Sequence, residues 1–128
     1  MPWSWSWPKP VQTDARGRSG VPVLLGGLDG PKLFEHIIEY GSGWMPLGGA
    51  GFSTGLQRLR DLAATSGRDP AEIDVIPFGA TTSHTTFDQM ESLGVSAAVF
   101  SLPSGSRETV LPALDELATF VAQRRGSA

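Results

Sequence analysis

Cysteine is absent from this chain of 128 residues. That absence excludes disulfide bonds, cysteine nucleophiles and thiolate metal sites. Histidine is scarce as well: there are two, they lie far apart in the sequence, and we predict no metal site. Positive charge is also sparse. The net charge is −3 and no basic cluster is longer than Arg124-Arg125, which argues against a nucleic-acid partner.

Long apolar runs are missing too. The longest are far below the roughly 18 residues that span a bilayer, and the N-terminus lacks the basic-then-apolar order of a signal peptide. We therefore expect no membrane association and, by default, a cytoplasmic location. The length is typical of one domain with a real hydrophobic core.

Glycine and proline, by contrast, are abundant, and they divide the chain into four strand-then-helix units. The first unit is a buried strand at 21–25 and a helix that begins at Pro31 and ends at Gly41. The second is a strand at 43–47 and a helix that is capped by Ser53 or Thr54 and ends at Gly67.

The last two units repeat this rhythm. A strand at 73–79 and a polar turn at 81–83 precede a helix that ends at Gly94. A strand at 95–102 precedes the last helix, which Thr109 caps, so that Pro112 falls within its first turn. Strands that alternate with helices predict an α/β fold with a parallel sheet. Both an open doubly wound sheet and a barrel fit, and four units are half of a barrel.

The best candidate for a binding site is the turn from Gly26 to Pro31, which joins a buried strand to a helix N-terminus. Glycine lets a ligand approach the backbone, and the first amides of a helix attract a phosphate. Glycines can also serve tight turning alone, and the spacing is neither a Walker loop nor a dinucleotide fingerprint.

A second candidate is Gly41-Ser42-Gly43-Trp44. Its glycines permit an unusual backbone, and Trp44 can either wall a planar ligand or pack in the core. The two histidines are weaker candidates for a functional site. His36 is expected on a solvated helix face, and His84 lies in a polar loop, where histidine is more typical of a turn or cap. We also expect solvated helix faces for five acidic residues, namely Glu35, Glu39, Asp61, Glu91 and Asp115.

Six stretches in order resemble one family of enzymes: WSWPKPVQ, PVLLGG, EYGSGWMPLGG, LRDLAATSGRDP, LGVSAAVFSLPS and LPALDELA. The chain is similar to the C-terminal half of the luciferase-like flavin- or deazaflavin-dependent oxidoreductases, and most similar to the branch that depends on coenzyme F-420. The resemblance covers the chain from about residue 5 to residue 121.

The resemblance implies a TIM-type (β/α)8 barrel, of which residues 21–128 are the C-terminal half and residues 1–20 a connecting segment. It implies hydride transfer between coenzyme F-420, or alternatively FMN, and an unknown organic substrate. It assigns Gly26 and Gly27 to the cofactor phosphate and matches Gly43 and Trp44 to a Gly-Asp-Gly-Trp motif. Ser42 replaces the aspartate of that motif here.

The family's first half, with most of its ring and substrate contacts, has no counterpart in this sequence. We therefore name no catalytic residue. The chain is either part of a longer enzyme or a non-catalytic half-barrel that pairs with a second copy. A weaker alternative is a phosphate-binding α/β module unrelated to flavins. In a half-barrel, Trp3, Trp5 and Trp7 are expected to be more exposed than tryptophans usually are.

Overall fold

The structure, a computed structural model, describes residues 20–47 and 52–126, in which short strands alternate with helices. In chain order the elements are β1 (Leu24–Gly26), α1 (Pro31–Tyr40), β2 (Gly43–Met45), α2 (Phe52–Thr65), the single 3-10 turn η1 (Pro70–Glu72), β3 (Asp74–Val75), β4 (Phe78–Ala80), α3 (His84–Ser92), β5 (Val99–Phe100) and α4 (Arg107–Gly126). Every strand pair is parallel, which confirms the α/β class. Within the described ranges no helix is both long and apolar enough to cross a membrane.

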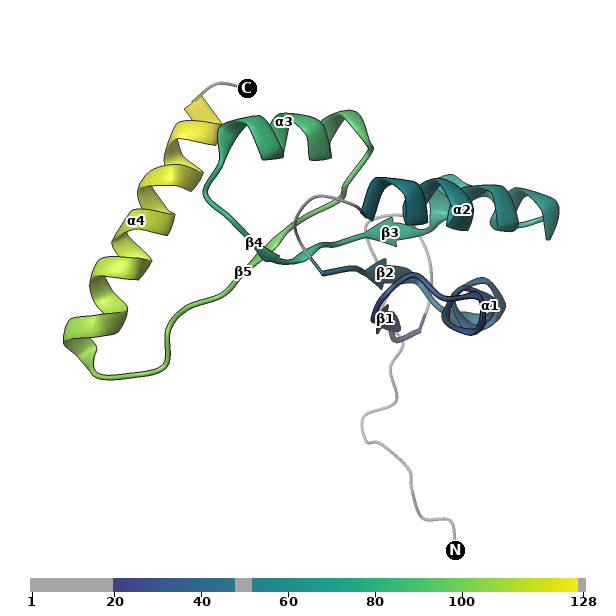
Figure 1. Ribbon diagram of the computed structural model, residues 1–128, viewed down its shortest axis with the longest axis horizontal. Coiled ribbons are helices and arrows are strands. Elements are labelled where there is room, and N and C mark those ends of the chain that lie inside the picture. Colours follow the sequence, from purple (N-terminus) through teal and green to yellow (C-terminus); the bar gives the residue numbers. More distant parts are fainter. Residues whose placement is uncertain (1–19, 48–51, 127–128) are drawn as a thin grey trace, which may run out of the picture.

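The strands form two parallel groups, β1-β2-β3 and β4-β5, and β4 continues the line of β3 after a short interruption (Figure 1). β1 pairs with β2 and β2 with β3, so that Leu25, Trp44 and Val75 are register partners. A bridge between Leu47 and Phe78 continues this register into β4, which pairs with β5. The expected connecting segment at 1–20, with its three tryptophans, lies almost entirely outside the described residues.

The predicted single strand at 73–79 is wrong, because the chain interrupts it at Ile76-Pro77. In the shared register Pro46 of the neighbouring strand lies beside Pro77, and both side chains are fully buried. The carbonyl groups of both prolines still accept hydrogen bonds. The amide of Phe78 donates to the Pro46 carbonyl at 2.8 Å, and the amide of Val99 donates to the Pro77 carbonyl at 2.9 Å. Neither proline can donate in return. Two donors are therefore missing at one level of the sheet, which we call the proline seam.

The outer strands are shorter than the predictions of 21–25 and 95–102. Before β1, Pro22 has no amide hydrogen, and the amide of Val23 donates to the Ser42 hydroxyl at 2.9 Å instead of to a ladder carbonyl. Beside β5, Pro77 offers no amide donor to the residues before Val99. The residues after Phe100 are exposed, without a further strand beside them in the described part of the chain.

Helix ends follow the expectations in part. α1 begins at Pro31 and stops at Gly41, where a Cβ would lie 2.8 Å from the Ile37 Cα atom. α3 begins after the polar turn, and the Ser83 hydroxyl accepts from the Thr86 amide at 3.2 Å. The predicted caps Ser53 and Thr54 are wrong, because α2 starts earlier, at Phe52, which packs against the core.

The predicted cap of the last helix is also wrong. The amide of Val110 donates to the Ser106 carbonyl at 3.0 Å, so α4 begins at Arg107 and Thr109 lies inside its first turn. Pro112 therefore falls in the second turn, where a donor is missing from the helix.

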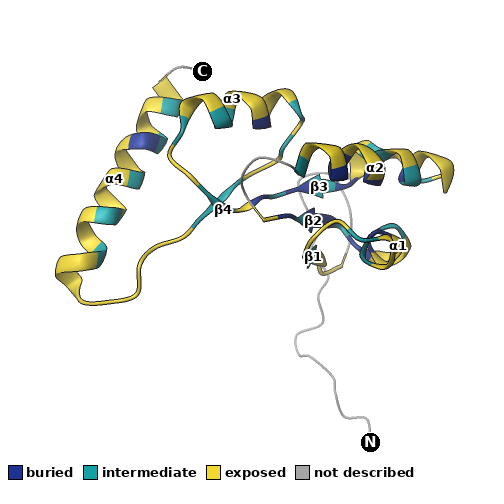
Figure 2. Ribbon diagram, in the orientation of Figure 1, coloured by how far each residue is buried: buried dark blue, intermediate teal, exposed yellow. Residues whose placement is uncertain are grey.

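The main core lies between α1, α2 and the first three strands (Figure 2). Ile37 of α1, Leu59 of α2 and Trp44 of β2 are almost completely buried. The full set of buried residues in this cluster is Phe34, Ile37, Trp44, Leu56, Leu59, Ala63, Ile73 and Val75. Because the two helices share one cluster, they cover the same face of the sheet.

A separate aromatic cluster joins α3, β5 and α4. The rings of Phe87 and Phe100 are stacked with centroids 5.6 Å apart, and Phe120 meets Phe87 edge-on at 5.1 Å. Arg124 of α4 donates to Asp88 at 2.8 Å and to Glu91 at 2.6 Å. These hydrogen bonds raise the pKa of Arg124 above its ordinary value, and the bond to Asp88 has the largest effect. The arginine therefore keeps its charge at every pH below strongly alkaline solution.

Candidate functional site

The candidate phosphate turn leaves the carboxyl end of β1 and leads into α1. Gly27 has a φ angle of +145°, a region that side-chain-bearing residues rarely adopt, and a Cβ there would lie 3.3 Å from the Leu33 side chain. At Gly26 an added Cβ would make only ordinary van der Waals contacts, the nearest being the Met45 carbonyl oxygen at 3.7 Å. Gly27 is thus required by the turn itself, whereas Gly26 is free to serve a ligand.

Trp44 holds this turn from the neighbouring strand. Its side chain is 1% exposed, and its ring meets Phe34 edge-on with centroids 5.2 Å apart. The indole Nε1–H donates to the Gly27 carbonyl at 3.1 Å. The ring therefore belongs to the core, and what it gives to the site is one hydrogen bond that fixes the turn.

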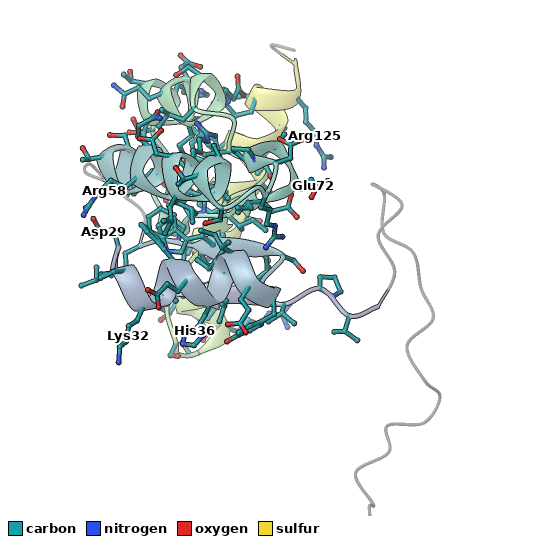
Figure 3. The ribbon with its side chains drawn as sticks, turned by 90° about the vertical axis from the view of Figure 1, so that its right-hand side faces the viewer. Asp29, Lys32, His36, Arg58, Glu72 and Arg125 are labelled. Atoms are coloured by element: carbon teal, nitrogen blue, oxygen red, sulfur yellow. The ribbon has the colours of Figure 1, made fainter. Side chains whose placement is uncertain are left out.

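The N-terminal part of α2 packs against the same turn. A Cβ on Gly55 would lie 2.8 Å from the Asp29 Cβ and 3.1 Å from the Trp44 ring, so only glycine lets the helix come this close. One turn further along α2, Arg58 forms an ion pair with Asp29 (Figure 3). The pair cancels the negative charge that Asp29 would otherwise place beside the turn.

The first amides of α1 are open at this edge. Gly30 precedes the helix without a side-chain cap, and Pro31 has no amide hydrogen. The amides of Lys32 and Leu33 lie in the first turn, whose donors have no partner inside a helix. Together with the glycine turn and the exposed guanidinium of Arg58, these donors fit a phosphate group. They carry no group suited to proton or hydride chemistry.

The second candidate motif lies at the opposite end of the strands. Gly43 is paired with Leu24, at the amino end of β2, whereas Gly26 is paired with Met45. A Cβ on Gly43 would lie 2.6 Å from the Asp74 carbonyl, and Ser42 accepts from the Val23 amide. The structure thus brings Trp44 to Gly27 but leaves Gly43 and Ser42 in the packing of β1, β2 and β3.

Both histidines lie on the surface. His36 is exposed on α1, as expected (Figure 3). His84 is the first residue of α3, beside the cap Ser83, and its Nε2 lies 3.2 Å from the Gln123 Oε1 atom of α4. The five acidic residues assigned to solvated faces are exposed, and Glu91 also pairs with Arg124. Over residues 20–47 and 52–126, no three potential ligands gather as a metal site would require.

Two parts of the site were not anticipated from the sequence. The pair of Arg58 with Asp29 joins residues 29 positions apart, and nothing in either local pattern indicates it. Gly55 did carry a signal, because a glycine inside a predicted helix often marks close packing.

Comparison with known proteins gives relatives without an assigned activity. No family model matches the chain, and no solved structure matches it. It is similar to the uncharacterized protein Mb0978c of Mycobacterium bovis and the uncharacterized protein Rv0953c of Mycobacterium tuberculosis, each 27% identical over 120 residues. The match covers 93% of this chain and 40% of each relative. The chain therefore spans about two fifths of the length of the curated relatives it matches.

Proposed function

We propose that the chain is the C-terminal part of a luciferase-like oxidoreductase barrel and supplies part of the site for the cofactor phosphate. The cofactor is coenzyme F-420, with FMN as the alternative, and it would carry hydride to or from an organic substrate. The observation that carries the proposal is the glycine turn at the carboxyl end of β1, held by Trp44 and followed by open helix amides.

The order of the strands supports the barrel. In a doubly wound sheet the order reverses at a switch point, and the ligand binds there. Here each paired strand is the next along the chain, and α1 and α2 cover one face. That arrangement is typical of consecutive units in a barrel, where ligands bind at the carboxyl ends of the strands.

The residues of the site take different parts in this proposal. Gly26, Gly27 and the first amides of α1 would contact the phosphate directly, and Arg58 would act by neutralising Asp29 beside the turn. Trp44 would act through its hydrogen bond to Gly27, and Gly43 by letting β3 approach β2. The unknown substrate and the ring of the cofactor have no partner that we can name among the described residues.

The test is a titration followed by nuclear magnetic resonance of the backbone amides. FMN or coenzyme F-420 should shift the amides at 26–33 and the Trp44 indole, whereas riboflavin, which has no phosphate, should leave the turn unchanged. Gly26→Ala adds a methyl group with ordinary space around it and should weaken the shifts at least several-fold. Gly105→Ala, at a distant glycine where a Cβ would also make only ordinary contacts, the nearest at 3.4 Å, should leave them unchanged.

Each other outcome has a meaning. Absence of shifts at the turn with either cofactor at saturating concentration would overturn the phosphate assignment. Equal shifts in the Gly26→Ala and Gly105→Ala variants would do the same. A phosphosugar that shifts these amides at lower concentration than either cofactor would instead favour a phosphate-binding module unrelated to flavins.

A further inference from the structure

The sheet has a second apolar face, which we call the inner face. Leu25, Trp44 and Val75 are register partners that point toward the helices, so the residues that alternate with them point the other way. Along the register this inner face consists of Leu24, Met45, Leu47, Ile76, Phe78 and Val99. Counting β3 and its continuation β4 as one interrupted strand, these six apolar side chains lie on four neighbouring strands. They form a surface of the kind that proteins normally bury.

The described residues cover it only in part, and Met45, Ile76 and Val99 are half-buried. Leu24 is 38% exposed, Leu47 59% and Phe78 46%, and none of the six belongs to the main core or packs against it. Parallel sheets occur almost only with both faces covered. The inner face therefore needs a partner that the helices of this chain do not supply.

Among residues 20–47 and 52–126, no further strand pairs with the outer edge of β1 or of β5. In β1 the carbonyl of Val23 and the amide of Gly27 bond toward β2, so the backbone groups of Leu24 and Gly26 point toward the free edge. At the other side of the sheet, the amide of Val99 in β5 donates to the Pro77 carbonyl. The backbone amide and carbonyl of the next residue, Phe100, therefore point toward the free edge. The free edges belong to different strands that run in the same direction.

We propose that a second copy of this chain covers the inner face, with β1 of each copy beside β5 of the other. A two-fold axis parallel to the strands creates both contacts at once and keeps every pairing parallel. Eight strands then form a closed ring whose interior is of a size that side chains fill. Two sheets stacked face to face would cover the inner face but leave all four edges open.

Closure also agrees with what lies on the inner face. Its six side chains are the residues that would fill a barrel interior, and Asp74, at the amino end of β3, is the one charged residue in the same alternation. The proposal rests on the half-barrel arrangement given above, and in the 128-residue chain by itself the second copy takes the place that the other half of a longer barrel would occupy. It does not depend on the cofactor, because the contacts involve only strands and inner-face side chains.

The first test is the mass in solution by light scattering. The chain should have twice its single-chain mass of 13.6 kDa. Phe78→Glu, which places a charge in the interior, should reduce the mass to that of one chain. Tyr40→Glu, a matched change at a residue 54% exposed at the end of α1, should leave the mass of the pair unchanged.

The second test uses the absence of cysteine and keeps the proposal testable if Phe78→Glu fails to fold. One preparation carries Leu24→Cys and another carries Val99→Cys. Because the stagger between β1 and β5 of the two copies is not fixed in advance, Ala97→Cys and Ser101→Cys are tested in place of Val99→Cys as well. Neighbouring parallel strands place Cα atoms within the distance that a disulfide requires. The mixture should form a disulfide-linked pair under mild oxidation, and each preparation alone should not.

The overturning results are distinct. A well-folded monomer of wild-type sequence at tens of micromolar would refute the pairing. A disulfide within the Leu24→Cys preparation alone, or no mixed disulfide at any of the three positions, would refute the arrangement of the strands. Failure to bind a cofactor would leave the measured mass unaffected, so the two proposals fail separately.

Discussion

At the scale of single residues, the glycines of the two candidate motifs and of the adjoining helix α2 differ in what they do. Gly27 is needed for its backbone angle, Gly43 and Gly55 for the close approach of neighbouring groups, and Gly26 for neither. Trp44 connects the first of these to the core by one hydrogen bond. A glycine-rich sequence is therefore compatible with both packing and binding, and only the surroundings of each residue separate the two.

The indole hydrogen bond can be tested without emptying the core. Trp44→Phe keeps an aromatic ring against Phe34 but removes the donor to Gly27, so the free energy of unfolding should fall by about 1 kcal/mol from the hydrogen bond, with a further loss from the smaller ring. Urea unfolding followed by circular dichroism measures it. Phosphate-dependent shifts at the turn should weaken in the same variant. Unchanged stability and unchanged shifts would contradict the role of this bond.

Gly43 offers a sharper steric test. In Gly43→Ala the new methyl group would lie 2.6 Å from the Asp74 carbonyl and 2.8 Å from the Leu24 side chain, so β2 and β3 must separate. The free energy of unfolding should fall by about 1–3 kcal/mol. Gly105→Ala, with its nearest contact at 3.4 Å, is the matched control and should change it by less than about 0.5 kcal/mol. Equal effects in the two variants would argue that the strands are not packed as closely as described.

At the scale of elements, α4 contains a residue, Pro112, that destabilises the helix in which it lies. In its C-terminal part, Phe120 packs in the aromatic cluster and Arg124 donates a hydrogen bond to Asp88 of α3. Its N-terminal part keeps Leu111 and Leu114 more than 40% exposed and includes Pro112 in the second turn. The helix is therefore held at one end and weakened at the other.

Replacing this proline should strengthen the helix. Pro112→Ala restores a donor and removes the clash of the ring with the preceding turn, so stability should rise by about 1–3 kcal/mol. The urea midpoint reports the change. Ala118→Pro, an exposed position in the same helix, should lower stability by about 3 kcal/mol. If Pro112→Ala were neutral, the helix would begin near residue 110 and not at Arg107.

At the scale of the whole molecule, the exposed inner face and the two open edges dominate. A fold whose apolar surface is covered only in a pair gains stability from mass action. The melting temperature of the wild-type chain should therefore rise with protein concentration. The Phe78→Glu variant should melt at a temperature that does not depend on concentration, and the same result for wild type would count against the pair.

How much of this molecule the sequence predicts depends on the range of the interaction involved. Local signals such as Pro31, Gly41 and Ser83 placed two helices, because caps and breakers act within one turn. The ends of the strands were misplaced, because they depend on partners such as Pro46 beside Pro77 and Ser42 beside Val23. The pair of Asp29 and Arg58 was missed for the same reason, since it exists only after α1 and α2 pack together.

The proline seam has a consequence for how the chain opens. It separates the core around Trp44 and Leu59 from the aromatic cluster around Phe87, and the ladder across it lacks two donors. Native-state hydrogen exchange should therefore resolve two cooperative units instead of one, with amides of α3 and α4 exchanging through partial unfolding while those of α1 and α2 remain protected. The carboxyl-terminal third of the molecule would then be the first to open under mild denaturant, with the glycine turn still in place.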